Sequence, residues 1–250
     1  MTILIGVLCQ DGVVVGTDSS ATFTTCRTPT IEQKCRKIEI IDDHVIIAGT
    51  GAAGLCQRFT AVVEDHWRNK GFKDKTPIQV GKELSAIGIK DFQSTTSPKG
   101  FGALVAFSAN GKFNLCEFAV EEFQPELKTE NIWYVAMGSG QNIADPFLGF
   151  MRRVFWKDVP PKINGAIFSV AWALNHTIEL NPGGINGPSQ IAILKHTKDG
   201  FRARMLDDAE ISEHEDNIHG AEEHLEKYKE ILEGKSNNKI PEPPDSIYKN

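Results

Sequence analysis

The chain has 250 residues, of which 40% are hydrophobic, and its formal net charge is −6. This length suits one domain with a substantial core, and a negative charge without a basic patch argues against binding of nucleic acid. Apolar runs stay below the 18 residues of a membrane span and the N-terminus lacks a signal peptide, so we expect a cytoplasmic protein without membrane contact. The five cysteines form no C-x-x-C pair, which predicts neither a zinc site nor a disulfide framework.

Apolar periodicity predicts the order of the secondary-structure elements. In chain order these are strands over 2–9, 13–15, 37–41 and 44–48, helices over 55–70 and 77–92, strands over 103–107, 113–118 and 131–137, helices over 147–155 and 163–179, and strands over 191–195 and 201–205. The polar, Thr- and Ser-rich stretch 17–29 is expected to be a loop or an irregular strand. Asn110-Gly111 is expected to form a hairpin turn.

The order of strands, two helices, strands, two helices and strands indicates the fold class. We expect an α+β fold, a four-layer αββα sandwich of two mainly antiparallel sheets between helical layers. Residues 1–206 are expected to form this domain. Residues 207–250 are expected to form a charged helix followed by a disordered tail. Within 212–232, the apolar residues are spaced like one face of a helix.

Thr2 is the first residue that could carry chemistry. Removal of Met1 would leave Thr2 with an amine and a hydroxyl on one residue. Because an α-amine titrates at about 7.7–8.0, part of it is a free base near neutral pH and can take the proton of the hydroxyl. A threonine at position 2 is nevertheless common, and alone it predicts no activity.

Four later residues each have a chemical and a structural interpretation. Asp18 could hold a lysine or cap a turn. Lys37 could lower the pKa of a nearby hydroxyl, or it could be an edge lysine that blunts aggregation. Gly49 ends a strand, so its N–H could face an oxyanion, or the glycine could merely permit the turn. Ser139 could cap a helix or bond the amine of Thr2.

The order and spacing of these residues resemble the proteasome β-subunit family. The resemblance rests on the N-terminal Thr, the Asp-Gly hairpin, the Asp, the Lys-Ile-x-x-Ile-Asp strand, the Ala-Gly before a helix and the later Gly-Ser-Gly. It is clearest over residues 2–60, moderate through 138–140 and 163–194, and absent beyond about residue 206. It favours a bacterial proteasome homologue related to the heat-shock-locus peptidase, and it implies the N-terminal-nucleophile hydrolase fold.

The resemblance implies a role for each matching position. Thr2 matches the nucleophile, Asp18 the acid that pairs with the catalytic lysine, Gly49 the oxyanion-hole glycine and Ser139 the serine that contacts the amine. Lys37 is the best match for the lysine.

Three further implications of the resemblance concern the lysine, an acid and a pocket. Lys34 is the alternative lysine and would fit a shorter connection. Asn181 stands where the family usually has an Asp, so a negative charge is missing there. The positions that would line the pocket for the residue before the scissile bond are Ala21, Ile47 and Gly51. Since none of the three is charged, an apolar or small substrate side chain is expected.

The function that the resemblance implies is a threonine-type endopeptidase without a cofactor, acting on peptides or unfolded proteins. Homo-oligomeric stacked rings are expected, with a separate ATP-driven unfoldase as a candidate partner. One alternative is a catalytically silent ring scaffold, although scaffold-type subunits carry an extra N-terminal helix and this chain starts on a strand. Another is an amidase or acylase of the same fold that acts on small amides.

The charged C-terminal helix has two interpretations. Leu225, Tyr228 and Leu232 lie on one helix face and could dock on a neighbouring subunit. A solvated helix with a frayed end is the alternative.

Overall fold

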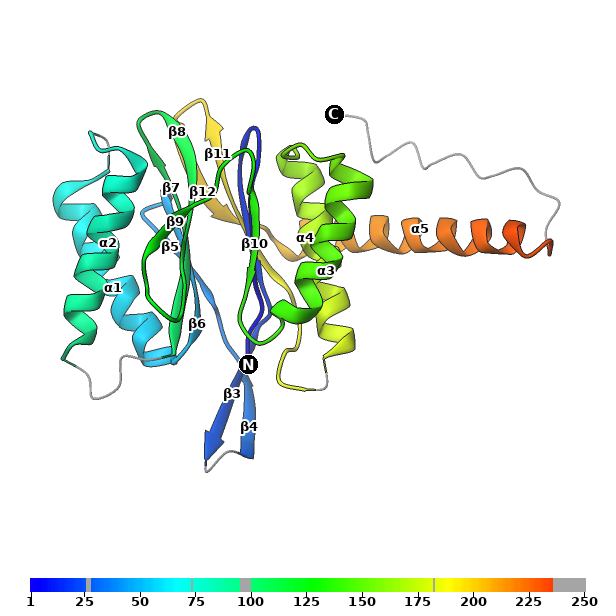
Figure 1. Ribbon diagram of the computed structural model, residues 1–250, viewed down its shortest axis with the longest axis horizontal. Coiled ribbons are helices and arrows are strands. Elements are labelled where there is room, and N and C mark those ends of the chain that lie inside the picture. Colours follow the sequence, from blue (N-terminus) through cyan, green and yellow to red (C-terminus); the bar gives the residue numbers. More distant parts are fainter. Residues whose placement is uncertain (26–27, 73, 95–99, 182, 236–250) are drawn as a thin grey trace. The chain divides into compact units, whose positions relative to one another are not determined.

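The computed structural model describes residues 1–25, 28–72, 74–94, 100–181 and 183–235. The chain forms two compact units, Met1–Leu206 and a second that starts at Asp207. In the first unit, two helices, two sheets and two further helices stack as four layers (Figure 1). The predicted four-layer α+β sandwich is confirmed.

The first sheet is antiparallel throughout and runs in the order β10-β1-β2-β11-β12. Its strands are β1 (Leu4–Leu8), β2 (Gly12–Thr17), β10 (Tyr134–Met137), β11 (Gln190–Thr197) and β12 (Gly200–Met205). Leu4 lies opposite Thr17 in the β1–β2 pair. Thr2 precedes β1 and Asp18 follows β2, so the hairpin brings both residues to the same end of the sheet.

The second sheet is also antiparallel and runs in the order β5-β6-β7-β8-β9. Its strands are β5 (Ile38–Ile41), β6 (Val45–Gly51), β7 (Phe101–Ala109), β8 (Lys112–Phe118) and β9 (Pro125–Leu127). The predicted turn between β7 and β8 is present, with φ of 52° at Asn110 and 70° at Gly111. Lys37 directly precedes β5, so it comes from the opposite sheet to Thr2.

Each sheet has its own pair of covering helices. The second sheet is covered by helices α1 (Ala53–Lys70) and α2 (Pro77–Phe92). The first sheet is covered by α3 (Gln141–Met151), which continues into a π-helical turn η1 (Arg152–Trp156), and by α4 (Ile163–Leu180). Side chains such as Leu4 and Val15 meet Ile46 and Leu104 between the two sheets, fully buried. Burial of each such side chain contributes about 1.5–3 kcal/mol to stability, and these contacts together hold the two sheets against each other.

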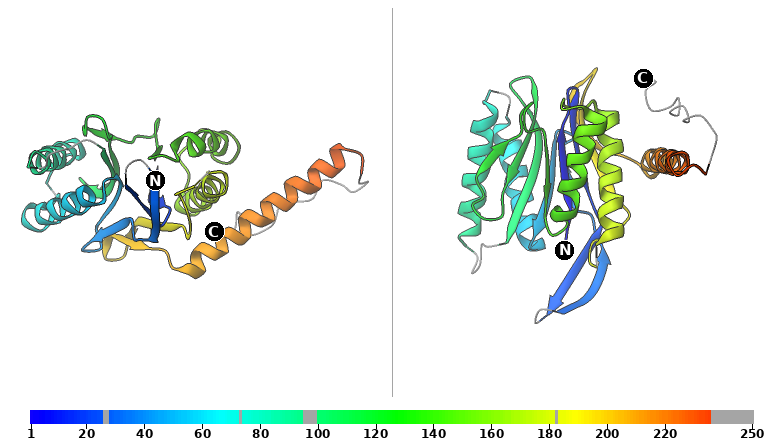
Figure 2. Two further views of the ribbon diagram at one scale, coloured as in Figure 1. Left: turned by 90° about the horizontal axis from the view of Figure 1, so that it is seen from below. Right: turned by 45° about the vertical axis from the view of Figure 1, so that its right-hand side comes forward.

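Of the two alternatives expected for 17–29, a loop or an irregular strand, the second is confirmed for Ser20–Thr25. This segment is β3, which pairs with β4 (Thr28–Lys34) in a two-stranded antiparallel sheet whose register shifts between Phe23 and Thr24. Threonine is β-branched and favours extended backbone, and this preference outweighs the polar composition that indicated a loop. The hairpin projects from the end of the sandwich at which the N-terminus lies (Figure 2).

In the second unit, α5 (Asp208–Leu232) includes the charged stretch 212–232 and begins four residues before it. Asp207 and Glu210 form a capping box that starts the helix earlier than its apolar spacing suggested. The tail expected to be disordered, 236–250, lies outside the described residues. Throughout the part of the chain that the structure describes, no helix is long and apolar enough to cross a membrane.

Candidate active site

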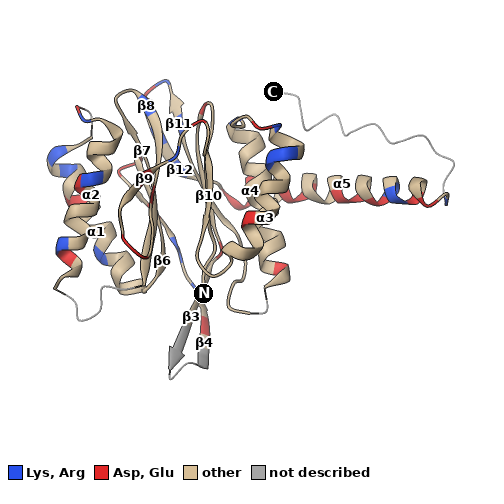
Figure 3. Ribbon diagram, in the orientation of Figure 1, with Lys and Arg blue, Asp and Glu red and all other residues tan. Residues whose placement is uncertain are grey.

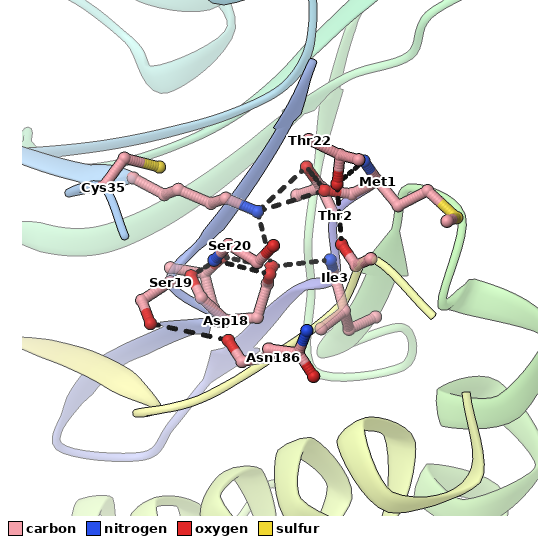
Figure 4. A network of polar contacts seen from close by, with 12 residues as sticks. Met1, Thr2, Ile3, Asp18, Ser19, Ser20, Thr22, Cys35 and Asn186 are labelled. Atoms are coloured by element: carbon pink, nitrogen blue, oxygen red, sulfur yellow. Dashed lines mark hydrogen bonds and ion pairs between the residues drawn. The ribbon is translucent and has the colours of Figure 1, made fainter. Parts of the chain in front are cut away.

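The site lies where the ends of the two sheets meet, and three chain segments supply its polar groups. Thr2 enters β1, Asp18 leaves β2, and Lys37 enters β5 from the other sheet. Figure 4 shows Thr2, Ile3 and Asp18 within one network of polar contacts, in which Lys37 Nζ bonds both Thr2 Oγ1 and Asp18 Oδ1.

The ammonium of Lys37 bridges the other two side chains. Its Nζ lies 2.7 Å from Asp18 Oδ1 and donates to Thr2 Oγ1 at 3.2 Å. The side chains of Lys37 and Asp18 are 9% and 0% exposed. Because so little water reaches the pair, its attraction is weakly screened, and the positive charge is held beside the hydroxyl.

The carboxylate of Asp18 is satisfied by backbone donors as well as by Lys37. Its Oδ1 accepts from Ile3 N at 3.1 Å and its Oδ2 from Ser20 N at 3.0 Å. A buried carboxylate with several donors is fixed in orientation. Asp18 therefore acts as the anchor that sets where the lysine ammonium lies.

The Gly-Ser-Gly turn after β10 holds the backbone of Thr2. Thr2 N donates to Ser139 Oγ at 3.1 Å, and Gly140 N donates to Thr2 O at 3.2 Å. Gly138 has φ of +94°, and a Cβ there would lie 2.4 Å from Thr2 O. Only glycine fits this close approach, so both glycines and the serine of the turn serve to place Thr2.

Gly49 lies inside β6 and not at its end, which corrects the predicted strand boundary. It pairs with Ala103 of β7, while the ladder between β5 and β6 stops at Ala48. The next residue reaches the site, because a Cβ on Gly138 would lie 3.0 Å from Thr50 Oγ1. This end of β6 is therefore adjacent to Thr2.

The structure places Asn181 and Lys34 apart from the Thr2 hydroxyl network. Asn181 is the C-cap of α4, and its Nδ2 donates to Gly183 O at 2.6 Å within its own loop. Lys34 is exposed at the end of β4, opposite Ser20. The ammonium beside Thr2 belongs to Lys37.

The three positions expected to line a substrate pocket have different environments. Ala21 is half-buried in β3, at the base of the hairpin. Ile47 is 1% exposed in the core cluster between α1 and the second sheet. Gly51 is exposed at the end of β6 with φ of +101°, where a Cβ would collide with Gly100 O. None of the three residues is itself charged.

Met1 precedes Thr2 and is held by the same groups. Its carbonyl oxygen accepts from Thr2 Oγ1 at 2.7 Å and from Lys37 Nζ at 3.2 Å, and its amine donates to Thr22 Oγ1 at 3.3 Å. Burial, followed by the charge of Lys37, lowers the pKa of this amine. With Met1 attached, the nitrogen of Thr2 is an amide and has no basic lone pair.

Two residues that hold the site together were missed in the sequence. Asn186 O accepts from Ser19 N at 3.0 Å, and the Gln190 side chain bonds the backbone around Lys37. Both lie in or after the Gly- and Pro-rich loop that follows α4, where polar residues are ordinary. Among the described residues, no group of three or more His, Cys, Asp and Glu side chains is arranged to hold a metal ion.

Comparisons with known proteins identify the family. The family model described as "Proteasome subunit" matches residues 2–150. The chain is 26% identical over 140 residues to proteasome subunit beta type-7 of Dictyostelium discoideum, a match that covers 56% of this chain and 49% of that protein. The chain thus spans about half the length of this curated relative. An Anbu (Gly-1) mutant from Hyphomicrobium sp. strain MC1 has the same fold, with a TM-score of 0.66 at 11% identity over 91% of this chain and 97% of that one. Because the family model matches more than half of its residues, this chain belongs to the proteasome subunit family.

Proposed function

We propose that this chain is a threonine-type endopeptidase subunit in which Thr2, freed by removal of Met1, attacks peptide carbonyls. The observation that carries the proposal is the buried Lys37 ammonium, 3.2 Å from Thr2 Oγ1 and 2.7 Å from Asp18. A fixed positive charge beside a hydroxyl lowers its pKa and favours the alkoxide that forms during attack.

In the first half-reaction, Thr2 Oγ1 bonds to the substrate carbonyl carbon and its proton passes to the free Thr2 amine. The amine then gives that proton to the departing nitrogen as the C–N bond breaks, which leaves an ester on Thr2. Water hydrolyses this ester by the reverse proton path and releases the acid product. We assign the oxyanion contact to the N–H of Gly49, which lies in β6 one residue before Thr50, the residue that reaches the site.

The remaining residues are assigned to placement. Ser139 accepts a hydrogen bond from Thr2 N at 3.1 Å and would keep the freed amine beside the hydroxyl. Asn181 carries no charge, and its side chain bonds Gly183 O within its own loop, so the carboxylate of this site is that of Asp18. We assign the walls of the pocket to Ala21, Ile47 and Gly51, which favours apolar or small side chains before the scissile bond.

Intact mass of the purified protein, with and without a threonine-directed epoxyketone, tests the proposal. We expect the loss of one methionine and one adduct per chain. The adduct should be absent in Thr2→Ala and unchanged in Thr129→Ala, a matched threonine in an exposed turn. A free Thr2 that never takes an adduct would instead indicate a silent ring scaffold. An adduct together with cleavage of small amides alone would indicate an amidase or acylase.

For the assembly, we propose homo-oligomeric stacked rings that enclose the sites and admit peptides or unfolded proteins. Such confinement would spare folded proteins of the cytoplasm, the proposed location. An ATP-driven unfoldase is a candidate partner because folded substrates could not enter unaided. These proposals rest on membership of the family, and the size of the particle in solution tests the ring assembly.

The distribution of charge supports α5 as a contact between copies. Residues 1–206 hold 22 Lys and Arg against 20 Asp and Glu, a net charge of +2, whereas 207–250 hold 5 against 13, a net charge of −8. Figure 3 shows the acidic residues along α5. On this acidic helix, Leu225 is 57% and Leu232 70% exposed. An acidic helix with an apolar stripe fits the more basic body of a neighbour.

Full-length Leu225→Asp and Leu232→Asp variants test this contact by light scattering at low and high salt. We expect smaller particles than the wild type forms at both salt concentrations. Glu222→Gln, an exposed residue of the same helix, is the control. Unchanged particle size in both leucine variants would show that α5 is only a solvated helix.

A further inference from the structure

The reactive groups of the proposed site belong to different sheets, so their separation depends on how the two sheets are held relative to each other. Thr2 and Asp18 sit at the end of the first sheet, whereas Lys37 enters the second at β5. Packed sheets are about 10 Å apart, and lysine has a long side chain with many rotamers. Placing its ammonium within 3.2 Å of Thr2 Oγ1 requires the backbone of Lys37 to be fixed relative to the first sheet.

The side chain of Gln190 makes that connection. Gln190 is the first residue of β11 in the first sheet and lies opposite Thr17, the neighbour of Asp18. Its Oε1 accepts from Lys37 N at 3.1 Å, and its Nε2 donates to Cys35 O at 2.7 Å. One amide group therefore grips the backbone on both sides of residue 36, just before β5 begins.

The grip is directional as well as close. A primary amide offers one acceptor and a donor group in a fixed plane, and here they meet an N–H and a C=O of the same strand segment. The pattern is the one that a neighbouring strand would offer, so Gln190 extends the pairing of β11 toward the segment that carries Lys37. One more bond supports this segment from the Asp18 side, from Cys35 N to Ser19 O at 2.8 Å.

We infer that Gln190 is a positioning residue that couples the two sheets and sets the distance between Lys37 and Thr2. The inference rests on the proposed function, since it assigns Gln190 to the same reaction. Gln190 touches no reacting atom and acts through the lysine backbone. A displacement of about 1 Å at a reacting group can cost about 100-fold in rate, so loss of this grip should lower turnover more than substrate binding.

Gln190→Met tests the inference, because methionine has nearly the shape of glutamine without its donor and acceptor. Hydrogen exchange at the Lys37 amide, read by mass spectrometry with fragmentation, should become about 10-fold faster or more. In peptide cleavage, kcat should fall about 10- to 100-fold with KM changed less than about two-fold. Gln124→Met, at an exposed glutamine whose side chain donates to Glu122 O two residues away, should match the wild type in both measurements.

Gln190→Glu gives a second measurement. It keeps an oxygen that accepts from the Lys37 N–H, but its other carboxylate oxygen would face Cys35 O, acceptor against acceptor. Its kcat should therefore fall at least as far as that of Gln190→Met. Faster exchange in Gln190→Met with unchanged kcat would overturn the positioning role. Unchanged exchange at Lys37 would overturn the contact itself. Faster exchange in a protein whose Thr2 never takes the epoxyketone adduct would support the contact and refute the proposed function.

Discussion

Replacing Asp18 by asparagine removes one charge from the centre of the site at almost constant shape. The side chain is fully buried, and the Lys37 side chain that it pairs with is 9% exposed. Asp18→Asn therefore leaves an ammonium in a place that water barely reaches. One oxygen also becomes an NH₂ group, which must face a backbone donor such as Ser20 N.

Two costs follow from this geometry. An uncompensated buried charge costs about 3–5 kcal/mol, and a donor that faces another donor costs about 1–3 kcal/mol. Relaxation of the lysine toward solvent offsets part of the total, so we expect a net loss of about 3–5 kcal/mol. In a unit of this length, 1 kcal/mol lowers Tm by about 2–4 °C, which gives a decrease of about 6–20 °C.

Thermal unfolding followed by circular dichroism, at one protein concentration because assembly raises Tm, measures this effect. The control is Asp42→Asn, which breaks the ion pair to Arg68 between side chains that are 41% and 56% exposed. Solvent screens this pair, so only a small decrease in Tm is expected. Adding Lys37→Met to Asp18→Asn should restore much of the stability, because it removes the unpaired ammonium. Equal decreases in Tm for Asp18→Asn and Asp42→Asn would refute the buried-pair reasoning.

Three further predictions concern the turn, the proposed base and a buried histidine. Gly138→Ala should lower the free energy of unfolding by at least about 1–3 kcal/mol, because φ at this position is +94° and the added Cβ would lie 2.4 Å from Thr2 O. Chemical denaturation measures this loss. An unchanged free energy of unfolding would contradict the close approach of Gly138 to Thr2. The rate of epoxyketone modification should rise with pH through a midpoint below pH 8.0, since burial and Lys37 lower the pKa of the N-terminal amine and would act likewise on a freed Thr2. In Lys37→Met this midpoint should move to higher pH. An unmoved midpoint would exclude the coupling between Lys37 and the amine. His66 is 8% exposed, and its pKa is lowered from 6.5, chiefly by burial. The unfolded chain therefore binds more protons than the folded one, so stability falls as pH drops through 6.5. His66→Gln should show a shallower decline of Tm between about pH 7 and 5.5, and parallel curves for the two proteins would count against a role of His66.

The layer order and most helices and strands could be predicted because they depend on local patterns. Strand pairs around Gly12 and Gly111, and the α2 helix that starts at Pro77, follow from turn chemistry and apolar spacing that act within a few residues. The pairing of β3 with β4 was not predicted, because the polar composition left a loop and an irregular strand both open. There the β preference of threonine and pairing between the two strands decide the structure.

For the site, the residue types and their order carried the information through resemblance to a family, and the structure brings Thr2, Asp18, Lys37 and Ser139 together. The choice between Lys34 and Lys37 depended on how many residues the hairpin takes up, and that number is fixed by strand pairing.

The sequence by itself determined the alternation of helices and strands, the strained glycines of the turns and the presence of a threonine beside the N-terminus. Tertiary structure alone decided which ammonium reaches that threonine and what holds it there. The contacts of Gln190 with residues 35 and 37 span more than 150 positions of the chain. Such contacts arise only when two sheets pack face to face, because the apolar burial that drives this packing acts on whole layers and leaves no local mark at the polar residues that it brings together.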